Sequence, residues 1–378
     1  MIPFNVPFTP EISKKYVLQA LSSNHQQGDG PFTESASKLL SNLVGGGHVL
    51  LTPSCTHALE LASMLANLGP GDEVILPSYH FTSAATAITK FGAKPVFVDI
   101  EMDTKGISLS QAKKAITSRT KAISWVNYAG VAPDIEGIQR LGKEYGLILI
   151  EDNAHGLGGT YKGRALGSFG DFATLSFHAT KNIQCGEGGA LVVNNPSFIE
   201  RAEVIREKGT DRSKFFRGEV QKYQWVDQGS SYLLAESLAA QLLGQLENFK
   251  EIHVRREQIF QRYKTSLHSW SESTKFSLPF VRDQDSHRAH MFYLVAKDRQ
   301  SRDGLIKQLD ESGIKCTFHY QSLGSSLKGR HYCSEPERLA VSEIMSNQLL
   351  RLPLHYSLSD EEQDSVVDTV LSFKHKSK

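Results

Sequence analysis

The sequence predicts an α/β fold in which helices cover a mainly parallel seven-stranded sheet. Seven short apolar, β-branched runs recur in the first half of the chain, and each is continuous rather than alternating, as in strands buried on both faces. These runs are HVLLT (48–52), EVILP (73–77), PVFVD (95–99), AISWVN (122–127), LILIED (147–152), FATLSF (172–177) and ALVVN (190–194). Between several of them lie helical stretches that end in glycine, at 56–69, 83–92 and 135–146. Strands that alternate with helices indicate crossover connections and therefore parallel strands.

A second, smaller α+β domain is predicted for the C-terminal third of the chain. With 378 residues, the chain exceeds the size at which one hydrophobic core usually suffices. We place a large domain, with the N-terminal segment, at residues 1–245 and a small domain at residues 246–378. A nearly proline-free helical stretch, 233–267, leads from one into the other. The small domain is expected to contain two strands (290–296 and 314–320), two helices (302–313 and 359–373) and a solvated basic tail (374–378).

The bulk composition excludes several classes of function. Net charge is +1, with 40% hydrophobic and 22% charged residues, so nothing favours a nucleic-acid or membrane-surface partner. No apolar run approaches the roughly 18 residues of a membrane helix. The N-terminal MIPFNVPFTP lacks the basic and apolar segments of a signal peptide. The four cysteines form no CxxC pair, which favours a cytoplasmic protein with free thiols. No His, Cys or carboxylate spacing suggests a metal site.

An acidic pair ends one of the predicted strands. Glu151 and Asp152 close the run LILIED, and in open α/β sheets binding sites form at the carboxyl ends of strands. A carboxylate in this position can hold a cationic partner, such as the protonated ring nitrogen of pyridoxal phosphate (PLP). The alternative is that the pair only caps the next helix. Taken alone, the two interpretations are balanced.

A lysine lies in the turn between two predicted buried strands. In TLSFHATKNIQCGEGGALVV (174–193), a strand leads to Ser176, a loop carries Lys181, and a GEGG segment opens the next strand. Most lysines are solvated surface charges, and that is the alternative here. A lysine between buried strands can instead be partly desolvated, which lowers its pKa and makes the amine nucleophilic. The glycines let the backbone approach a flat ligand closely.

Two further segments fit the same kind of ligand. In LLTPSCTHALELA (50–62), small hydroxyl residues, Ser54 and Thr56, stand between a strand and a helix, where free N–H groups can bind a phosphate. An ordinary N-cap is the alternative, and it is the favoured one when this segment is considered alone. In LPSYHFTSAA (76–85), Tyr79, His80 and Phe81 follow a strand, and an aromatic ring there could stack on a cofactor or belong to the core.

Together these segments resemble the DegT/DnrJ/EryC1/StrS family of PLP-dependent sugar aminotransferases. The resemblance rests on their order and on the spacing Ser-x4-Lys-x4-GEGG with EDNAHG upstream, and it runs from the opening IPFN and GDGPFT to RLPLHYSLS near the end. It implies PLP fold type I, the fold of aspartate aminotransferase. It also implies that Lys181 carries PLP as a Schiff base and acts as general acid and base, and that Asp152 pairs with the pyridine nitrogen. The cofactor shell implied by matching position is Cys55, Thr56 and Ser176 at the phosphate, Phe81 on the ring face and His155 at the ring hydroxyl.

The sequence departs from the family pattern at two positions. His155 stands where the family often has Gln. The family usually supplies an Asn from the neighbouring subunit in a G-x-N-x-R segment, which here reads GSSYL (229–233). Ser231 is the candidate that replaces this Asn. The shared site implies a homodimer.

Within the family, the segments LLTPSCT, GDEVILPSY, NYAGVAPD, YKGRALG, IREKGTDRSKFFRGEV and GSSYL resemble the members that form dTDP-4-amino-4,6-dideoxygalactose. The implied reaction is a ping-pong transamination. Glutamate converts PLP to pyridoxamine phosphate (PMP), and PMP then aminates a dTDP-4-keto-6-deoxyhexose. The basic segment 206–217 would clamp the nucleotide diphosphate, although it could be only a solvated loop. The candidate substrate residues are Tyr128, Arg206, Lys208, Arg212, Arg217, His319 and Tyr320.

Several alternatives remain open. The same chemistry could give the 4-amino-4,6-dideoxyglucose product or amination at C3. A family dehydratase has His in place of the Schiff-base lysine, and Lys181 argues against it. A non-catalytic sugar-binding regulator is the alternative from another class, and the intact set of Asp152, Lys181 and GEGG argues against it.

Overall fold

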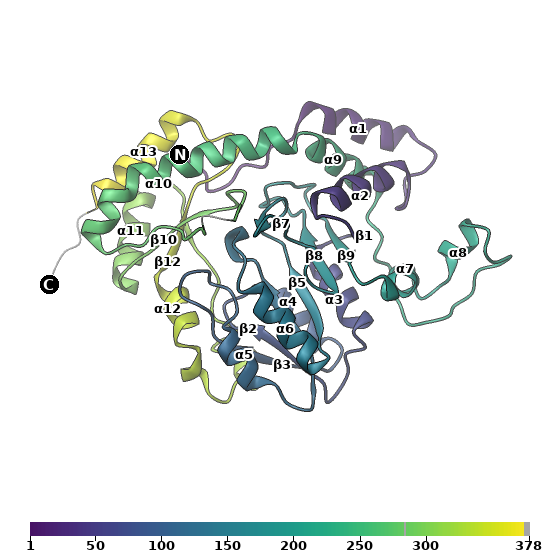
Figure 1. Cartoon of the computed structure of the whole chain (residues 1–378). Coiled ribbons are helices and arrows are strands. Elements are labelled where there is room, and N and C mark those ends of the chain that lie inside the picture. The colour runs from purple at the N-terminus through teal and green to yellow at the C-terminus, as the bar shows by residue number, and fades with distance from the viewer. Residues whose placement is uncertain (283–284, 374–378) are drawn as a thin grey trace.

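The computed structural model describes residues 1–282 and 285–373. The predicted basic tail, 374–378, lies outside the described residues. Figure 1 shows a sheet domain wrapped by helices beside a smaller domain formed by the C-terminal part of the chain, with the helix α10 (Phe249–Thr274) running along both. Among the described residues, no helix combines the length and apolarity needed to cross a bilayer.

The predicted seven-stranded sheet is confirmed. Its order is β1-β9-β8-β5-β4-β2-β3. Only β9 runs antiparallel to its neighbours, and the four remaining pairings are parallel. The strands are β1 (His48–Thr52), β2 (Glu73–Pro77), β3 (Lys94–Val98), β4 (Thr120–Val126), β5 (Ile148–Asp152), β8 (Phe172–Ser176) and β9 (Gly189–Val193). Each lies within two residues of a predicted run, because continuous apolar runs are buried on both faces.

Helices cover both faces of this sheet. One face packs Leu76 and Ile150 against α3 and α4, and the other packs Ile123 and Leu149 against α5 and α6. Towards β1 and β9, α2 and α9 cover the second face. The helices of this domain are α1 (Glu11–Ser22), α2 (Pro31–Leu43), α3 (Cys55–Leu65), α4 (Thr82–Thr89), α5 (Leu109–Ala115), α6 (Ile135–Tyr145), α7 (Ile199–Arg206), α8 (Arg212–Phe216) and α9 (Glu236–Glu247). A short hairpin joins β6 (Thr160–Tyr161) to β7 (Arg164–Ala165).

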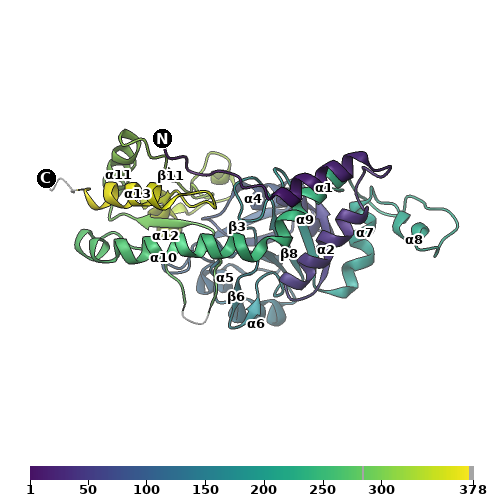
Figure 2. The same ribbon diagram turned by 90° about the horizontal axis from the view of Figure 1, so that it is seen from above.

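The small domain is an antiparallel sheet of order β10-β12-β11 with helices around it. Its elements are β10 (Phe292–Val295), α11 (Arg299–Glu311), β11 (Thr317–Phe318), α12 (Ala340–Gln348), β12 (Leu349–Leu352) and α13 (Asp360–Leu371). Figure 2 shows α10 and α13 side by side, and together they cover a separate core. The sequence did not predict β12, which has only four residues, and β11 is shorter than the predicted strand 314–320.

The helical stretch predicted over 233–267 is two helices rather than one. It begins at Glu236, and Asn248 separates α9 from α10. The Asn248 side chain donates to the carbonyl of Gly244 at 2.8 Å, which satisfies an acceptor at the end of α9. The N-terminal segment lies against the small domain, since the Ile2 N–H donates to the Gly313 carbonyl at 2.8 Å. The domain boundary at residue 245 stays a prediction.

The two acidic residues that end β5 point to opposite sides and have different roles. Glu151 is fully buried and accepts hydrogen bonds from the Asn127 side chain (2.8 Å) and from the backbone N–H groups of Gly167 (2.7 Å) and Phe169 (3.0 Å). It therefore fixes the loop between β7 and β8 to the end of β5. Asp152 follows on the other side of the strand, facing a cavity, because side chains alternate along a strand.

We expect Glu151→Ala to lower the free energy of unfolding by about 2–4 kcal/mol, because three buried donors lose their acceptor. The measurement is denaturant unfolding followed by circular dichroism. Glu136→Ala is the matched control, since exposed Glu136 makes only a surface ion pair with Lys162, and it should change stability by about 0.5 kcal/mol or less. Equal effects of the two substitutions would contradict the role given to Glu151.

Candidate active site

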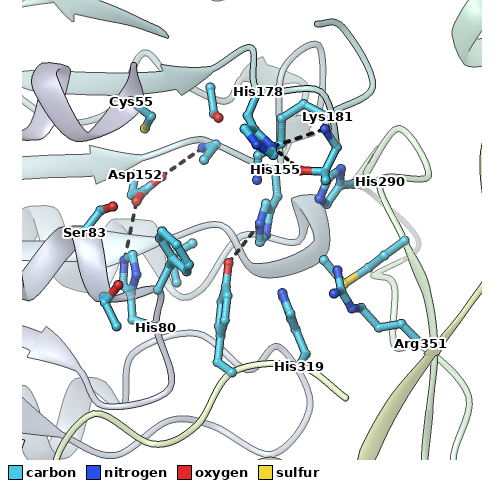
Figure 3. Close-up of a pocket in the computed structure, with 18 of the residues that line it drawn as sticks. Cys55, His80, Ser83, Asp152, His155, His178, Lys181, His290, His319 and Arg351 are labelled. Carbon is cyan, nitrogen blue, oxygen red and sulfur yellow. Dashed lines mark hydrogen bonds and ion pairs between the residues drawn. The ribbon is translucent and has the colours of Figure 1, made fainter. Parts of the chain in front are cut away.

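A cavity of about 670 Å³ opens at the carboxyl ends of the sheet strands, between the two domains. Its walls come from the loops after β2, β5 and β8, from the start of α3, and from the small domain. The N-terminal Phe4 and Asn5 also line it. Figure 3 shows side chains of both domains converging on this space. The strand ends that carried the sequence argument therefore meet in one place.

Lys181 is in the cavity wall, on the loop that joins β8 to β9. Backbone hydrogen bonds from Ala179 to Gly186 and from Lys181 to His178, both 2.8 Å, hold this loop in shape. Burial of the amine lowers the pKa of Lys181 to about 8, while the nearby Cys55 and Asp152 act in the opposite direction. The interpretation of this lysine as a solvated surface charge is therefore wrong.

Asp152 is on the opposite side of the cavity from Lys181 in Figure 3. It is only 4% exposed. One carboxylate oxygen accepts from the Ala154 N–H at 3.0 Å, and the other lies 3.6 Å from Nε2 of His80. Asp152 thus faces the cavity and also closes a turn. The element after β5 is the strand β6 rather than a helix, so the interpretation of the acidic pair as a helix cap is wrong. Burial lowers the pKa of His80, while Asp152 acts in the opposite direction.

The start of α3 forms a cradle for an anion. Ser54 is the N-cap, and its hydroxyl accepts from the His57 N–H at 3.2 Å. The N–H groups of Cys55 and Thr56 in the first turn have no acceptor within the helix. Thr56 shares a 2.7 Å hydrogen bond with Ser83, and Ser176 lines the same cavity. The N-cap interpretation is confirmed, and the geometry also suits a phosphate.

The strand β9 approaches this cradle so closely that only glycine fits. A Cβ atom on Gly189 would lie 2.4 Å from the Cys55 backbone nitrogen. This glycine belongs to the GEGG segment, and it allows the loop of Lys181 and the start of α3 to meet. Burial raises the pKa of the Cys55 thiol, so it is not a thiolate.

Aromatic and imidazole rings form the remaining walls. Phe81 is 54% exposed on the cavity surface, where it can cover the face of a flat ring. His155 accepts from the Ala129 N–H at 3.4 Å, contacts the Tyr320 hydroxyl at 3.2 Å and stacks on His290 with ring centroids 4.3 Å apart. Burial holds the pKa of His155 well below its usual value, so the ring is neutral. A neutral ring can serve where the family often has an uncharged Gln.

The three other candidates of this region divide into two groups. His319 and Tyr320 line the cavity. Tyr128 is buried behind them, and its hydroxyl lies 2.6 Å from Nδ1 of His319. Tyr128 therefore supports His319, and its role towards substrate stays a prediction.

The basic segment 206–217 does not reach the cavity of its own chain. Arg206 is buried and bonds to the Leu51 carbonyl and to Asp29. Other residues of the fold therefore hold this guanidinium, and its role towards substrate stays a prediction. Residues 212–216 form the helix α8 rather than a loop, on an arm that extends away from the body in Figures 1 and 2.

The remaining candidates of the arm are outward-facing or paired locally. Lys208 and Arg212 contact Glu207, and Arg217 contacts Glu203 and Glu219. Ser231 is exposed and pairs with Glu207 in an isolated bridge. Their roles towards substrate and cofactor stay predictions.

Sequence reasoning missed several residues of the cavity. His290 and Arg351 come from the small domain, and Asn5 comes from the N-terminal segment. His80 lies in the aromatic segment 76–85, but the sequence does not indicate that its Nε2 lies 3.6 Å from the Asp152 carboxylate. Within the described part of the chain, no group of three or more His, Cys, Asp or Glu side chains could hold a metal ion.

These residues fit PLP. The cavity has an anion cradle at one end, a carboxylate for a ring nitrogen, an aromatic wall and an amine of lowered pKa. A cofactor aldehyde requires a neutral amine, which the half-buried Lys181, with its pKa lowered to about 8, can supply.

Comparisons with known proteins agree with this site. The family profile described as the DegT/DnrJ/EryC1/StrS aminotransferase family matches residues 9–371. Aminotransferase TlmJ from Streptoalloteichus hindustanus has a TM-score of 0.90 at 29% identity, over 98% of both chains. Spr1654 from Streptococcus pneumoniae, provisionally described as a sugar aminotransferase, has a TM-score of 0.89 at 27% identity over 98% of both chains, and its structures include PMP, PLP and apo forms. PseC from Helicobacter pylori, an aminotransferase of pseudoaminic acid biosynthesis, has a TM-score of 0.88 at 26% identity over 98% of both chains. The predicted PLP fold type I is confirmed.

The lowered pKa of Lys181 predicts its pH-dependent reactivity in the cofactor-free protein. Only a neutral amine reacts with acetic anhydride, so labelling of Lys181 should be half-maximal near pH 8 and increase above it. Mass spectrometry of the Lys181 peptide measures this, with the exposed Lys38 as internal reference. A midpoint above about pH 10, the ordinary value for lysine, would contradict the described burial of the amine.

Proposed function

The chain belongs to the DegT/DnrJ/EryC1/StrS aminotransferase family, and on that premise we propose that it transfers an amino group from glutamate to C4 of a dTDP-4-keto-6-deoxyhexose. It is a PLP-dependent sugar aminotransferase, an enzyme of the transferase class. The proposal adds the donor, the nucleotide, the position of amination and a product of galactose configuration. The single observation that carries the chemistry is the Lys181 amine of lowered pKa facing Asp152 across one cavity.

Each residue of the cavity would have a distinct role in binding the cofactor or in proton transfer. When bound, PLP supplies an electron sink. Asp152 would keep the ring nitrogen protonated, the start of α3 with Ser176 would hold the phosphate, and Phe81 would cover the ring. The Nζ atom of Lys181, which is neutral above about pH 8, would take the proton from the donor Cα and return it as general acid and base.

The projecting arm supports a homodimer with shared sites. Phe216 is 69% exposed and Trp225 is 79% exposed on this arm, together with Phe215, Tyr223 and Val226. Clustered exposed apolar side chains favour a protein contact, and a second copy of the chain is the partner that the family resemblance implies. In such a dimer the arm would bring Ser231 and the basic side chains of 208–217 to the cavity of the neighbouring subunit. All four cysteines are free, which supports the proposed cytoplasmic location.

The direct test is the product formed from dTDP-4-keto-6-deoxyglucose, PLP and glutamate. We expect a dTDP-4-amino-4,6-dideoxy sugar. Nuclear magnetic resonance of the product identifies the carbon that carries nitrogen, and the proton couplings at that carbon separate the galactose from the glucose configuration. Amination at C3, or a product of glucose configuration, would show that the exact sugar proposed is wrong. A protein that leaves both glutamate and the keto-sugar unchanged would contradict the proposed reaction.

Arg212 and Arg217 should act on the nucleotide sugar. Both side chains are partly solvent-accessible on the arm, and guanidinium groups bind diphosphates through charge-assisted hydrogen bonds. The double variant Arg212→Ala with Arg217→Ala should raise KM for the keto-sugar by roughly 10-fold or more, and conversion of PLP to PMP by glutamate should be unchanged.

The control for this experiment is Arg140→Ala, which removes an exposed arginine of α6 far from the arm in the sequence. It should leave both half-reactions intact. A damaged glutamate half-reaction in the double variant would mean that the arm recognises the donor instead. An unchanged KM for the keto-sugar would show that the segment 206–217 is an ordinary solvated surface.

A further inference from the structure

The segment 2–8 joins the small domain to the loop between β8 and β9. Near one end of the segment, the Ile2 N–H donates to the Gly313 carbonyl of the small domain at 2.8 Å. At the other end, the Phe8 carbonyl accepts a hydrogen bond from the Gln184 side chain at 2.9 Å, and this side chain belongs to the loop. The segment is therefore fixed to both domains.

Asn5 contacts the same loop between these two ends. It lines the cavity, and its side-chain amide donates to the Ala179 carbonyl at 3.1 Å. Ala179 precedes Lys181 by two residues, and Gln184 follows Lys181 by three. The segment 2–8 therefore holds the loop on both sides of Lys181.

Backbone pairing within the loop fixes its base. The Phe177 N–H donates to the Gly188 carbonyl, and the Ala179 N–H donates to the Gly186 carbonyl, each at 2.8 Å. Lys181 lies beyond these pairs, at the tip of the loop. The position of its amine therefore also depends on the groups that hold the tip to the rest of the protein.

The small domain provides a second attachment for the tip. The Asn182 side chain donates to the Arg288 carbonyl at 2.8 Å. Its amide oxygen, which can only accept, lies 3.0 Å from Nδ1 of His290. The tip of the loop thus has one amide contact from Asn5 and one from its own Asn182.

Desolvation has a larger effect on the Lys181 amine than the charges around it. Burial lowers the pKa of Lys181 to about 8, Arg351 acts in the same direction, and Cys55 and Asp152 act in the opposite one. Histidines within electrostatic range of the amine are neutral, because burial holds their pKa well below the usual value; they are His155, His290 and His319. Release of the tip into solvent would therefore return the amine towards the ordinary lysine pKa of about 10.4.

We propose that Asn5 is a positioning residue for Lys181, because its amide holds the Ala179 carbonyl and so keeps the tip of the loop, with the amine, in the cavity and out of bulk water. The alternative is that Asn5 adds only to the stability of the fold. The inference deepens the proposed function and rests on it for the reaction that the amine serves. It gives the segment 2–8 a role in preparing the amine.

The test is the labelling of Lys181 by acetic anhydride in the cofactor-free protein, with Lys38 as internal reference. In the Asn5→Ala protein, the pH of half-maximal labelling should increase from near 8 to about 9 or above, since a loosened tip exposes the amine to water. Asn5→Gln keeps an amide donor on a longer side chain, and its midpoint should lie between those of wild type and Asn5→Ala.

Asn347→Ala is the matched control. Asn347 lies on α12 outside the cavity, and its side chain likewise donates to a backbone carbonyl, that of Glu343, at 2.9 Å. Its loss should leave the labelling midpoint of Lys181 near pH 8. Thermal unfolding of each variant shows that it is folded at the temperature of labelling.

A second measurement uses the PLP-loaded protein and follows its conversion to the PMP form by absorbance at increasing glutamate. Asn5→Ala should lower the limiting rate several-fold, because the proton-transferring amine is less well placed. The glutamate concentration for half-maximal rate should stay within about twofold of wild type, because Asn5 acts on the amine rather than on the substrate.

An unchanged labelling midpoint in Asn5→Ala would overturn the inference. Equal increases in Asn5→Ala and Asn347→Ala would overturn it as well, because they would indicate a general loosening of the fold. A normal midpoint with an increased half-maximal glutamate concentration would make Asn5 a substrate contact instead. If wild type does not react with glutamate, the donor in the proposed function is wrong, but the labelling needs no substrate and still decides the role of Asn5.

Discussion

Desolvation of one amine, which faces one carboxylate across the same cavity, is the constraint on which the site depends. Lys181 is desolvated enough to have a pKa near 8, and Asp152 keeps its carboxylate within electrostatic range. The sheet order creates this arrangement. Because β8 lies between β5 and β9, the end of β5 and the loop from β8 to β9 occur at the same edge. Parallel pairing of β5 and β8 then brings Asp152 and Lys181 to one cavity.

The other parts of the fold maintain this arrangement. Glu151 accepts hydrogen bonds from the loop before β8 and so holds that loop to the end of β5. Because side chains alternate along a strand, the next residue, Asp152, faces the cavity instead. Gly189 lets β9 approach the start of α3. The small domain closes the cavity with neutral rings and with the cation of Arg351. In the proposed function, large-domain residues would serve the cofactor, and small-domain residues would provide the walls that substrates meet.

The fold and the cofactor shell could be predicted from sequence because their signals are local. Each sheet strand is a continuous apolar run. Asp152 ends one of these runs, and Lys181 and the start of α3 each follow a run within a few residues. The small-domain contributions could not be predicted in this way. Arg351 is on a four-residue strand without a clear pattern, and its neighbours His290 and His319 are distant in sequence. Tyr128 and Arg206 looked available for substrate because sequence does not reveal that they are buried.

The central claim is that Lys181 is the attachment point of the cofactor opposite Asp152. Borohydride reduction of the PLP-loaded protein, followed by proteolysis and peptide mass spectrometry, tests it most directly. The account predicts that the reduced cofactor is fixed to the single peptide that contains Lys181, and that the Lys181→Ala protein remains folded but carries no fixed cofactor. Attachment to a different lysine, or unchanged attachment in Lys181→Ala, would contradict it.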